Sequence, residues 1–93
     1  MSQILFEWDE SKNQANIEKH GISFFKAQYV FSDPKHIILE DLEHSIVEKR
    51  YYCIGEIDEE IVTVRFTYRV NNIRIIGAGY WRRGKRIYEN ENN

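Results

Sequence analysis

The stretch IVTVRFTYRV, from Ile61 to Val70, decides the fold because its side chains alternate in kind. Successive side chains of a strand point to opposite faces of a sheet. One series is apolar (Val62, Val64, Phe66, Tyr68, Val70) and the other is mostly polar (Ile61, Thr63, Arg65, Thr67, Arg69). We therefore expect an antiparallel sheet with helices over Val62, Val64, Phe66 and Tyr68, while Arg65, Thr67 and Arg69 face solvent or a ligand.

Other segments after Pro34 show the same period of two and are also strand candidates. With the stretch above, these candidates are His36 to Asp41, Lys49 to Ile57, Ile61 to Val70 and Ile73 to about Trp81. Asp58-Glu59-Glu60 and Asn71-Asn72 are predicted to form hairpin turns, the second because Asn tolerates a positive φ.

Before Pro34 the sequence predicts one strand and two helices. Ile4 to Trp8 is short, apolar and aromatic, which favours a strand. Asp9 is a suitable N-cap for a helix from Glu10 to His20, and Gly21 can close it in a left-handed conformation. A second helix follows an N-cap at Ser23 and ends before Asp33-Pro34. Its core stripe consists of Phe24, Ala27 and Phe31.

The predicted fold class is α+β, with two N-terminal helices on one face of an antiparallel sheet. We predict the order β-α-α-β-β-β, with a short C-terminal helix over Arg82 to Asn90 as an optional addition. The 93 residues are expected to form a single domain, 1–93. One cysteine, Cys53, favours a reducing compartment. Neither a signal peptide nor a membrane span is evident, so we expect a cytoplasmic protein.

Charge is distributed very unevenly along the chain. The first 64 residues hold six cations against thirteen acids, although the formal net charge of the whole chain is only -2. Residues 65–88 hold seven cations and no acid: Arg65, Arg69, Arg74, Arg82, Arg83, Lys85 and Arg86. Arginines pair with phosphates, and interleaved aromatic rings such as Tyr80 and Trp81 can stack on unpaired bases. The segment therefore favours RNA binding, although a solvated face or a docking surface for an acidic partner explains it equally well.

The three histidines give little sign of a metal. His36 and Glu40 would share one strand face about 13 Å apart, too far to bind one ion. We interpret His36 and His44, together with the acids near them, as surface residues of an acidic loop. His20 ends the first predicted helix, where it is either a cation bonded to a free carbonyl or a proton-transfer group.

Six motifs follow one another through nearly the whole chain. They are FEWDESKNQANIEKHGISF (Phe6 to Phe24), Val30-Phe31-x-Asp33, Glu48-x-Arg50, Thr67-x-Arg69, Arg74-Ile75-Ile76 and Tyr88. In this order they resemble the BrnT family, small bacterial ribonuclease toxins of type II toxin-antitoxin systems with a RelE-like fold. The resemblance implies RNA cleavage without a metal or other cofactor. It also implies inhibition by a small cognate antitoxin, for which we expect a ribbon-helix-helix type that alone contacts operator DNA, and no membrane partner.

Site roles follow from this resemblance and from the cationic segment. Arg69 and Arg74 are predicted to hold the scissile phosphate, and His20 or Lys19 to transfer protons. RNA binding is assigned to Arg65, Thr67, Tyr80, Trp81, Arg82, Arg83, Lys85 and Arg86. The alternative is a binding module whose cationic face grips an acidic antitoxin or nucleic acid without cleaving it.

The chain departs from the family pattern at Gly77 and Gly79. The family usually reads R-I-I-S-A-R there, so a serine and an arginine are missing. The following segment is one residue shorter, and Lys85 stands near a usual glutamate. Two interpretations follow: Arg82 or Arg83 supplies the missing charge from another direction, or the enzyme is weak or inactive.

Overall fold

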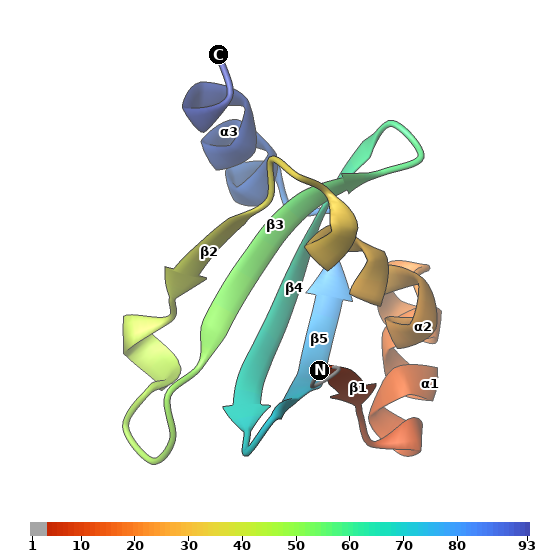
Figure 1. Ribbon diagram of the computed structural model, residues 1–93. Helices are drawn as coiled ribbons and strands as arrows, with labels where there is room; N and C mark the ends of the chain where they lie inside the picture. The colour runs from red at the N-terminus through yellow and green to blue at the C-terminus, as the bar shows by residue number, and fades with distance from the viewer. Residues whose placement is uncertain (1–3) are drawn as a thin grey trace.

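One five-stranded sheet with helices on both sides organises the protein in a computed structural model, which describes residues 4–93 (Figure 1). The strands are β1 (Leu5–Glu7), β2 (Ile37–Glu40), β3 (Tyr51–Ile57), β4 (Glu60–Arg69) and β5 (Asn72–Gly79). The α-helices are α1 (Glu10–His20), α2 (Phe24–Ala27) and α3 (Arg82–Glu91), and the 3₁₀ segments are η1 (Gln28–Ser32) and η2 (Leu42–His44). The predicted α+β class is confirmed.

The sheet has the order β1-β5-β4-β3-β2 and is mixed, so the prediction of an antiparallel sheet was wrong. β2, β3, β4 and β5 pair antiparallel in sequence, whereas β1 pairs parallel with β5. Tight hairpins permit only antiparallel pairing, but β1 reaches the sheet through two helices and is free of that constraint. All four strand candidates after Pro34 form strands, so the predicted order was one strand short.

Both N-terminal helices begin as predicted and α1 also ends as predicted, but the second α-helix ends at Ala27 and continues as the 3₁₀ segment η1. The Asp9 carboxylate accepts hydrogen bonds from the Ser11 and Lys12 N–H groups, and Gly21 closes α1 with φ of 73°. Buried asparagines, more than apolar residues, dock this helix. The Asn16 amide donates to the carbonyls of Ile22 and Ala78, at 2.9 and 3.0 Å, and accepts from the Ala78 N–H. This bonding explains how a helix with few apolar residues packs against β5.

The core lies between the sheet and the N-terminal helices, on what we call the inner face of β4. Val62, Val64 and Phe66 are fully buried there, against Phe24, Ala27 and Val30. Tyr68 was also predicted to be covered, but it is 51% exposed because the helices do not extend to that end of β4. The β4–β5 turn was also predicted one residue late, since Val70 adopts the positive φ of 56°.

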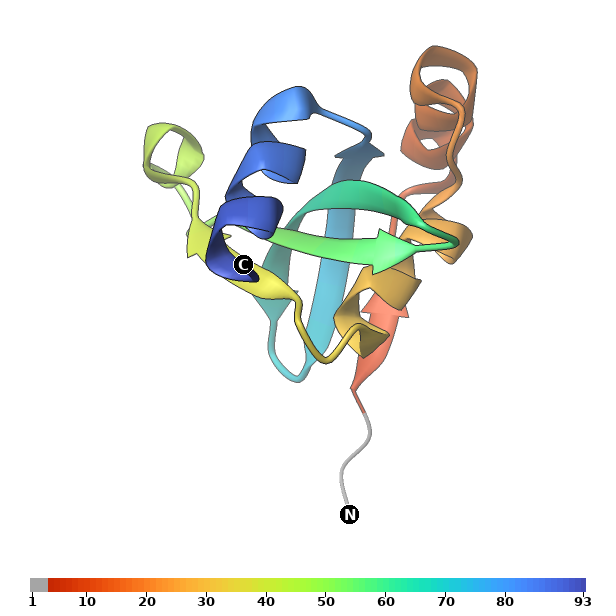
Figure 2. The same cartoon turned by 90° about the horizontal axis from the view of Figure 1, so that it is seen from above.

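The opposite, outer face carries α3, which both views show well apart from α1 and α2 (Figures 1 and 2). α3 packs on β3 and β4 through Gly84, whose α-carbon lies directly over Thr63. A side chain at Gly84 would collide with the Thr63 hydroxyl. The optional C-terminal helix therefore exists and covers the Thr63 end of the outer face, leaving the rest of that face open.

Candidate nucleic-acid interface on the outer face

The open part of the outer face carries arginines from β4, from β5 and from the segment just before β3. Thr67 pairs with Arg74 across β4 and β5, and Arg69 pairs with Asn72. Arg65 lies one step further along, opposite Gly77 on one side and Tyr52 on the other. Arg50 precedes β3 on the same side of the sheet. Four guanidinium groups thus share one surface, although they are far apart in sequence.

Carboxylates from other parts of the chain pair with most of these arginines. Arg74 Nη1 lies 3.1 Å from Glu7 Oε2, and Arg69 Nη2 lies 3.7 Å from Glu48 Oε2. The other oxygen of Glu48 lies 3.7 Å from Arg50 Nη2. These pairs are partly exposed, and such contacts typically contribute at most about 1 kcal/mol each. A phosphate could therefore displace them at low cost.

Thr67 has a structural role in addition to its position on this face. Its side chain is 2% exposed, and its hydroxyl donates to the Lys49 carbonyl at 2.7 Å. The expectation that Thr67 faces outward is thus correct in direction, but the segment before β3 covers it. It anchors the chain beside Arg50 and has no hydroxyl proton left for RNA.

Arg65 is the arginine whose bonding is least complete. Three buried polar side-chain atoms of residues 4–93 lack a hydrogen-bond partner: Arg50 Nε, Thr63 Oγ1 and Arg65 Nε. All three belong to the outer face. Buried donors without partners are rare in folded proteins, and an anionic ligand is one way to satisfy them.

A cavity of about 560 Å³ adjoins Arg65 between α3 and the β2 edge. Its aromatic and charged lining consists of Tyr52 and Trp81, the cations Arg65 and Arg83, and the acids Glu40, Asp41 and Glu43. Arg83 thus reaches the neighbourhood of Arg65 from α3. This position fits the interpretation in which a cation after β5 compensates for the arginine missing at Gly79.

The two glycines that depart from the family pattern sit in different surroundings. A β-carbon at Gly79 would lie 3.0 Å from the Trp81 indole, which occupies the space of a side chain there. A β-carbon at Gly77 would meet nothing closer than Arg65 Cδ at 3.9 Å. Trp81 therefore takes the place of the missing side chain at Gly79, whereas Gly77 leaves room beside Arg65.

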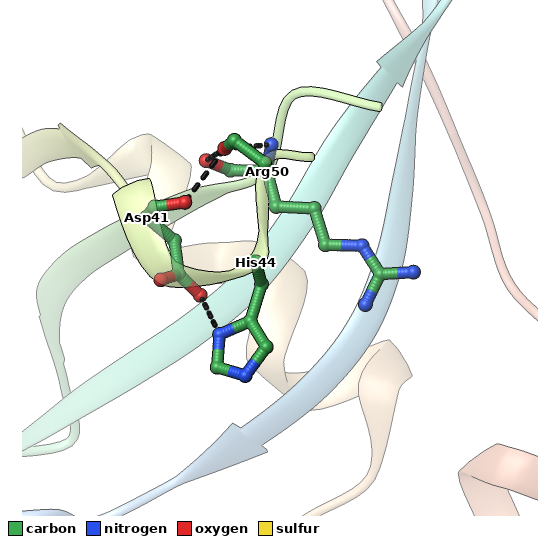
Figure 3. Close-up of polar contacts among 4 residues, drawn as sticks. Asp41, His44 and Arg50 are labelled. Atoms are coloured by element: carbon green, nitrogen blue, oxygen red, sulfur yellow. Dashed lines mark hydrogen bonds and ion pairs between the residues drawn. The ribbon is translucent and has the colours of Figure 1, made fainter. Parts of the chain in front are cut away.

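Asp41 and His44 form a pair that the sequence analysis missed. The Asp41 side chain is 5% exposed, and its Oδ2 lies 2.8 Å from His44 Nδ1 (Figure 3). Burial alone would raise the pKa of Asp41, but hydrogen bonds from His44 and Tyr52 and the charges of His44 and Arg65 outweigh it and lower the pKa. Interpreting Asp41 as a surface residue of an acidic loop was therefore wrong, because its carboxylate is enclosed and bonded, whereas His44 is exposed as predicted.

The structure divides the predicted catalytic residues between two ends of the sheet. Arg69 and Arg74 lie near the β4–β5 turn. His20 lies beyond the other end of β5, where its ring contacts the Trp81 indole edge to face at 5.2 Å between centroids. The five steps from Arg74 to Gly79 span roughly 16 Å of strand. Lys19 is exposed at the end of α1, and the structure gives it no contact with the arginines.

The predicted RNA-binding residues are likewise split. Trp81 and Arg83 line the cavity beside Arg65, whereas Tyr80 and Lys85 line a second cavity of about 910 Å³ with Glu56, Glu59 and Glu60. Arg82 and Arg86 are exposed on α3. Local acids around Tyr80 and Lys85 weaken any attraction of that side for phosphate. The cationic segment of the sequence is therefore not one cationic surface.

Several residues of the outer face were not assigned a role from the sequence. Glu48-x-Arg50 was among the quoted motifs, and its spacing of two could have placed both side chains on one face. Glu7 stands in the first motif, but its contact with Arg74 depends on the parallel β1–β5 pairing. Asp41 and His44 are three residues apart, the spacing of one helical turn, which was the available signal for their contact.

The chain is thus an α+β domain with arginines gathered on one open sheet face. Comparison with known families identifies the protein family: residues 8–84 match the family described as "Ribonuclease toxin, BrnT, of type II toxin-antitoxin system". The chain belongs to this family, whose members are toxins with ribonuclease activity and an antitoxin partner. Curated proteins yielded no significant match. Within residues 4–93, no helix is long and apolar enough to cross a membrane.

Proposed function

We propose that this chain is an endoribonuclease that cleaves RNA by attack of a 2′-hydroxyl on the adjacent phosphate, without a metal ion. Family membership supports ribonuclease activity. The observation that carries the mechanism is the gathering of Arg50, Arg65, Arg69 and Arg74 on one open sheet face. Fixed guanidinium groups can stabilise the charge that grows on a phosphate in the transition state.

Arg69 and Arg74 are the groups that we assign to the scissile phosphate. Both arginines are held by carboxylates that neutral water would not displace, but a dianionic transition state competes well for a guanidinium fork. Each arginine would exchange a partly exposed carboxylate for phosphate oxygens, since solvent screens both the 3.1 Å Arg74–Glu7 and the 3.7 Å Arg69–Glu48 contacts. Protein groups then supply the charge that a metal ion supplies in other nucleases.

Flanking nucleotides would bind along α3. Trp81 is 37% exposed and lines the cavity beside Arg65, so its indole is a candidate platform for a base. Arg82, Arg83 and Arg86 supply phosphate contacts from the same helix. Tyr80 and Lys85 line the other cavity, so they would contact the RNA only if the RNA strand bends around the start of α3.

The antitoxin partner that the family implies is proposed to be of the ribbon-helix-helix type, with operator DNA bound only through it. We expect it to cover part of the outer face, where arginines are paired weakly enough to accept acidic groups. Complementary charge would make association fast and sensitive to salt. An association rate that is equal at low and high salt would place the contact elsewhere.

The RelE-like fold implied by the resemblance also stays a prediction.

Single-turnover cleavage of a labelled RNA by the purified protein tests the proposal. Arg69→Ala and Arg74→Ala should each lower the cleavage rate on the order of 100-fold, while RNA affinity falls much less. Arg86→Ala on exposed α3 is the matched control: it should weaken binding and flatten its salt dependence but leave the rate at saturation unchanged.

A wild-type protein that binds RNA or antitoxin with ordinary salt dependence, yet shows no cleavage above background, would contradict the enzymatic proposal. The chain would then be the binding module considered as the alternative. Equal losses of turnover in Arg69→Ala, Arg74→Ala and Arg86→Ala would instead show that these arginines contribute through overall charge and do not contact the scissile phosphate.

A further inference from the structure

The Asp41–His44 pair has the geometry of an oriented proton-transfer group. Asp41 Oδ2 and His44 Nδ1 are 2.8 Å apart, and the carboxylate is enclosed while the His44 side chain is 49% exposed. An ionised carboxylate can only accept a hydrogen bond, so Nδ1 must carry a proton in this contact. Figure 3 shows Nε2 on the side of the ring away from Asp41, so a neutral ring protonated at Nδ1 presents the Nε2 lone pair there.

Backbone hydrogen bonds fix this pair in place. The Asp41 N–H donates to the Arg50 carbonyl at 2.7 Å, and the Ser45 hydroxyl donates to the Asp41 carbonyl at 2.6 Å. The Arg50 N–H in turn donates to the Ser45 hydroxyl at 3.0 Å. The two ends of the η2 connection are thus tied together, and the loop that carries His44 begins and ends beside Arg50. Rigid support of this kind is what a catalytic side chain needs.

Cationic donors adjoin the pair on the sheet. The charge of Arg65 acts on the Asp41 carboxylate, and Asp41 and Arg65 line the same cavity. Arg50 and Arg65 each keep a buried Nε without a partner. Asp41 thus joins the exposed imidazole to the cavity that contains Arg65, while Arg50 is tied to Asp41 through the backbone. Such a set of groups suits an anion that must also lose or gain a proton.

We propose that His44 is the general base of RNA cleavage, that Asp41 is its positioning residue, and that Arg65 contacts the phosphate beside it. This assignment rests on the proposed ribonuclease function and replaces His20 and Lys19 as the base. It also explains how the chain can act without the arginine missing at Gly79, because Arg65 and Arg83 line the same cavity as Asp41.

The chemical step balances with groups of the chain and water. His44 Nε2 removes the proton of a 2′-hydroxyl, the 2′-oxygen forms a bond to phosphorus, and the bond from phosphorus to the 5′-oxygen breaks. The leaving oxygen takes a proton from water, and the hydroxide that remains takes the proton from the His44 ring. The products are a 2′,3′-cyclic phosphate and a 5′-hydroxyl, with His44 neutral again.

The chain has three histidines, so three matched variants test the assignment: His20→Gln, His36→Gln and His44→Gln. In single-turnover cleavage of labelled RNA at saturating protein, His44→Gln should lower the rate by a factor of about 10²–10⁴. His36 bonds the Asp33 carbonyl at the opposite end of β2 from Asp41, so His36→Gln should match the wild type. The wild-type rate should also rise with pH through one ionisation that His44→Gln lacks.

Asp41→Asn tests the positioning role separately. An asparagine can present its amide to Nδ1 and favour the other ring tautomer, so the maximal rate should fall while KM stays unchanged. Nitrogen NMR shifts of the His44 ring should move from the tautomer protonated at Nδ1 toward the one protonated at Nε2. A buried carboxylate carries a folding risk, but His44 is half-exposed, and His44→Gln keeps the test decisive if Asp41→Asn does not fold.

Each result separates this assignment from the proposed function. If the wild type cleaves RNA and His44→Gln cleaves it at the same rate and with the same pH profile, the assignment is overturned and the ribonuclease proposal stands. If His20→Gln abolishes cleavage while His44→Gln does not, the base lies at the α1 end. If the wild type does not cleave RNA, both proposals are overturned together.

Discussion

The residues of β4 alternate between two faces of the sheet, and the two faces differ in how completely their side chains are packed or hydrogen-bonded. On the inner face, Val62, Val64 and Phe66 are fully buried in a continuous apolar core. On the outer face, α3 covers Thr63 and the segment before β3 covers Thr67, whereas the side chain of Arg69 is 49% exposed. The buried side-chain polar atoms of residues 4–93 that lack a partner lie on the outer face, as do the Arg69–Glu48 and Arg74–Glu7 ion pairs.

This difference separates stability from function. Apolar packing stabilises the fold without needing any specific partner, whereas incompletely bonded polar groups cost stability unless a ligand satisfies them. We therefore expect inner-face substitutions to change the free energy of unfolding, and substitutions on the open outer face to change RNA binding and turnover. A variant of the open outer face that strongly destabilises the fold, or an inner-face variant that leaves stability unchanged, would contradict this expectation.

The largest effect should come from truncating the inner face. Phe66 is fully buried and contacts the rings of Phe31 and Tyr51 at centroid distances of 5.1 and 5.6 Å. Phe66→Ala should lower the free energy of unfolding by about 3–5 kcal/mol because it leaves a cavity. Arg69→Ala, three residues further along β4, should change it by no more than about 0.5 kcal/mol. Urea denaturation followed by circular dichroism compares them, and equal losses would contradict the division.

The next largest effect concerns the contact that joins the two layers. The Tyr88 hydroxyl of α3 donates to Asp33 Oδ2 at 2.6 Å, and Asp33 ends η1 on the inner side. Tyr88→Phe should cost about 1.5–3 kcal/mol at pH 7, the usual contribution of a hydrogen bond to a charged group. Denaturation midpoints at several pH values measure it.

The pH dependence of this loss has a definite sign. Burial alone would raise the pKa of Asp33, but hydrogen bonds from Tyr88 and from the Lys35 and Glu56 N–H groups outweigh it and lower the pKa. A carboxylate with a lowered folded pKa stabilises above its unfolded value of about 4 and loses that contribution as the pH falls through the folded value. The wild type and Tyr88→Phe should therefore converge below that pH. A difference that stays constant down to pH 2 would rule out the Asp33 contact as its origin.

Burial, followed by the hydrogen bond to Asp33, raises the pKa of Tyr88 itself to about 12. A raised folded pKa means that stability is fully present below the unfolded value of about 10 and is lost as the pH rises toward 12. Wild-type stability should thus fall in strong alkali more steeply than that of Tyr88→Phe.

A smaller effect should distinguish the covered end of the outer face from its open part. Gly84→Ala gains about 1 kcal/mol of helix propensity, but its β-carbon collides with the Thr63 hydroxyl, and such overpacking typically costs about 1–3 kcal/mol. Thr63→Ala removes that hydroxyl, which has no hydrogen-bond partner. We expect Gly84→Ala to destabilise the wild type and to be neutral or stabilising beside Thr63→Ala. A double-mutant cycle by thermal melting measures the coupling, and additive effects would contradict close packing of α3.

Local sequence signals predicted the elements of the fold well. Asp9, Gly21 and Ser23 cap the N-terminal helices as expected, because capping depends only on neighbouring backbone groups. Pairing of β1 with β5 depends on where a distant strand arrives, which no local pattern encodes. The positive φ at Val70 was missed for a related reason, since the register of β4 with β5 overrides the preference of Val for extended backbone.

The candidate site was predicted less completely than the fold. Alternation in β4 placed Arg65 and Arg69 on the outer face, as the structure has them. A run of seven cations in sequence suggested one cationic surface, but Glu7 and Glu48 come to that surface from elsewhere in the chain. The run of cations therefore identified the segment that carries the arginines. It did not predict the net charge of the outer face, which also depends on the acids that tertiary structure brings there.

The smallest expected effect on stability is also the sharpest test of the outer face. Glu7→Gln removes the carboxylate that holds Arg74 at 3.1 Å but keeps a side chain of the same shape. Both partners are partly exposed, so the free energy of unfolding should fall by less than about 1 kcal/mol. RNA affinity at low salt should rise, because an RNA phosphate no longer has to displace the Glu7 carboxylate from Arg74. Glu18→Gln, at an exposed position of α1, is the control for the change in net charge. Equal gains in both variants would attribute the effect to net charge, whereas a gain confined to Glu7→Gln would locate a bound phosphate at Arg74.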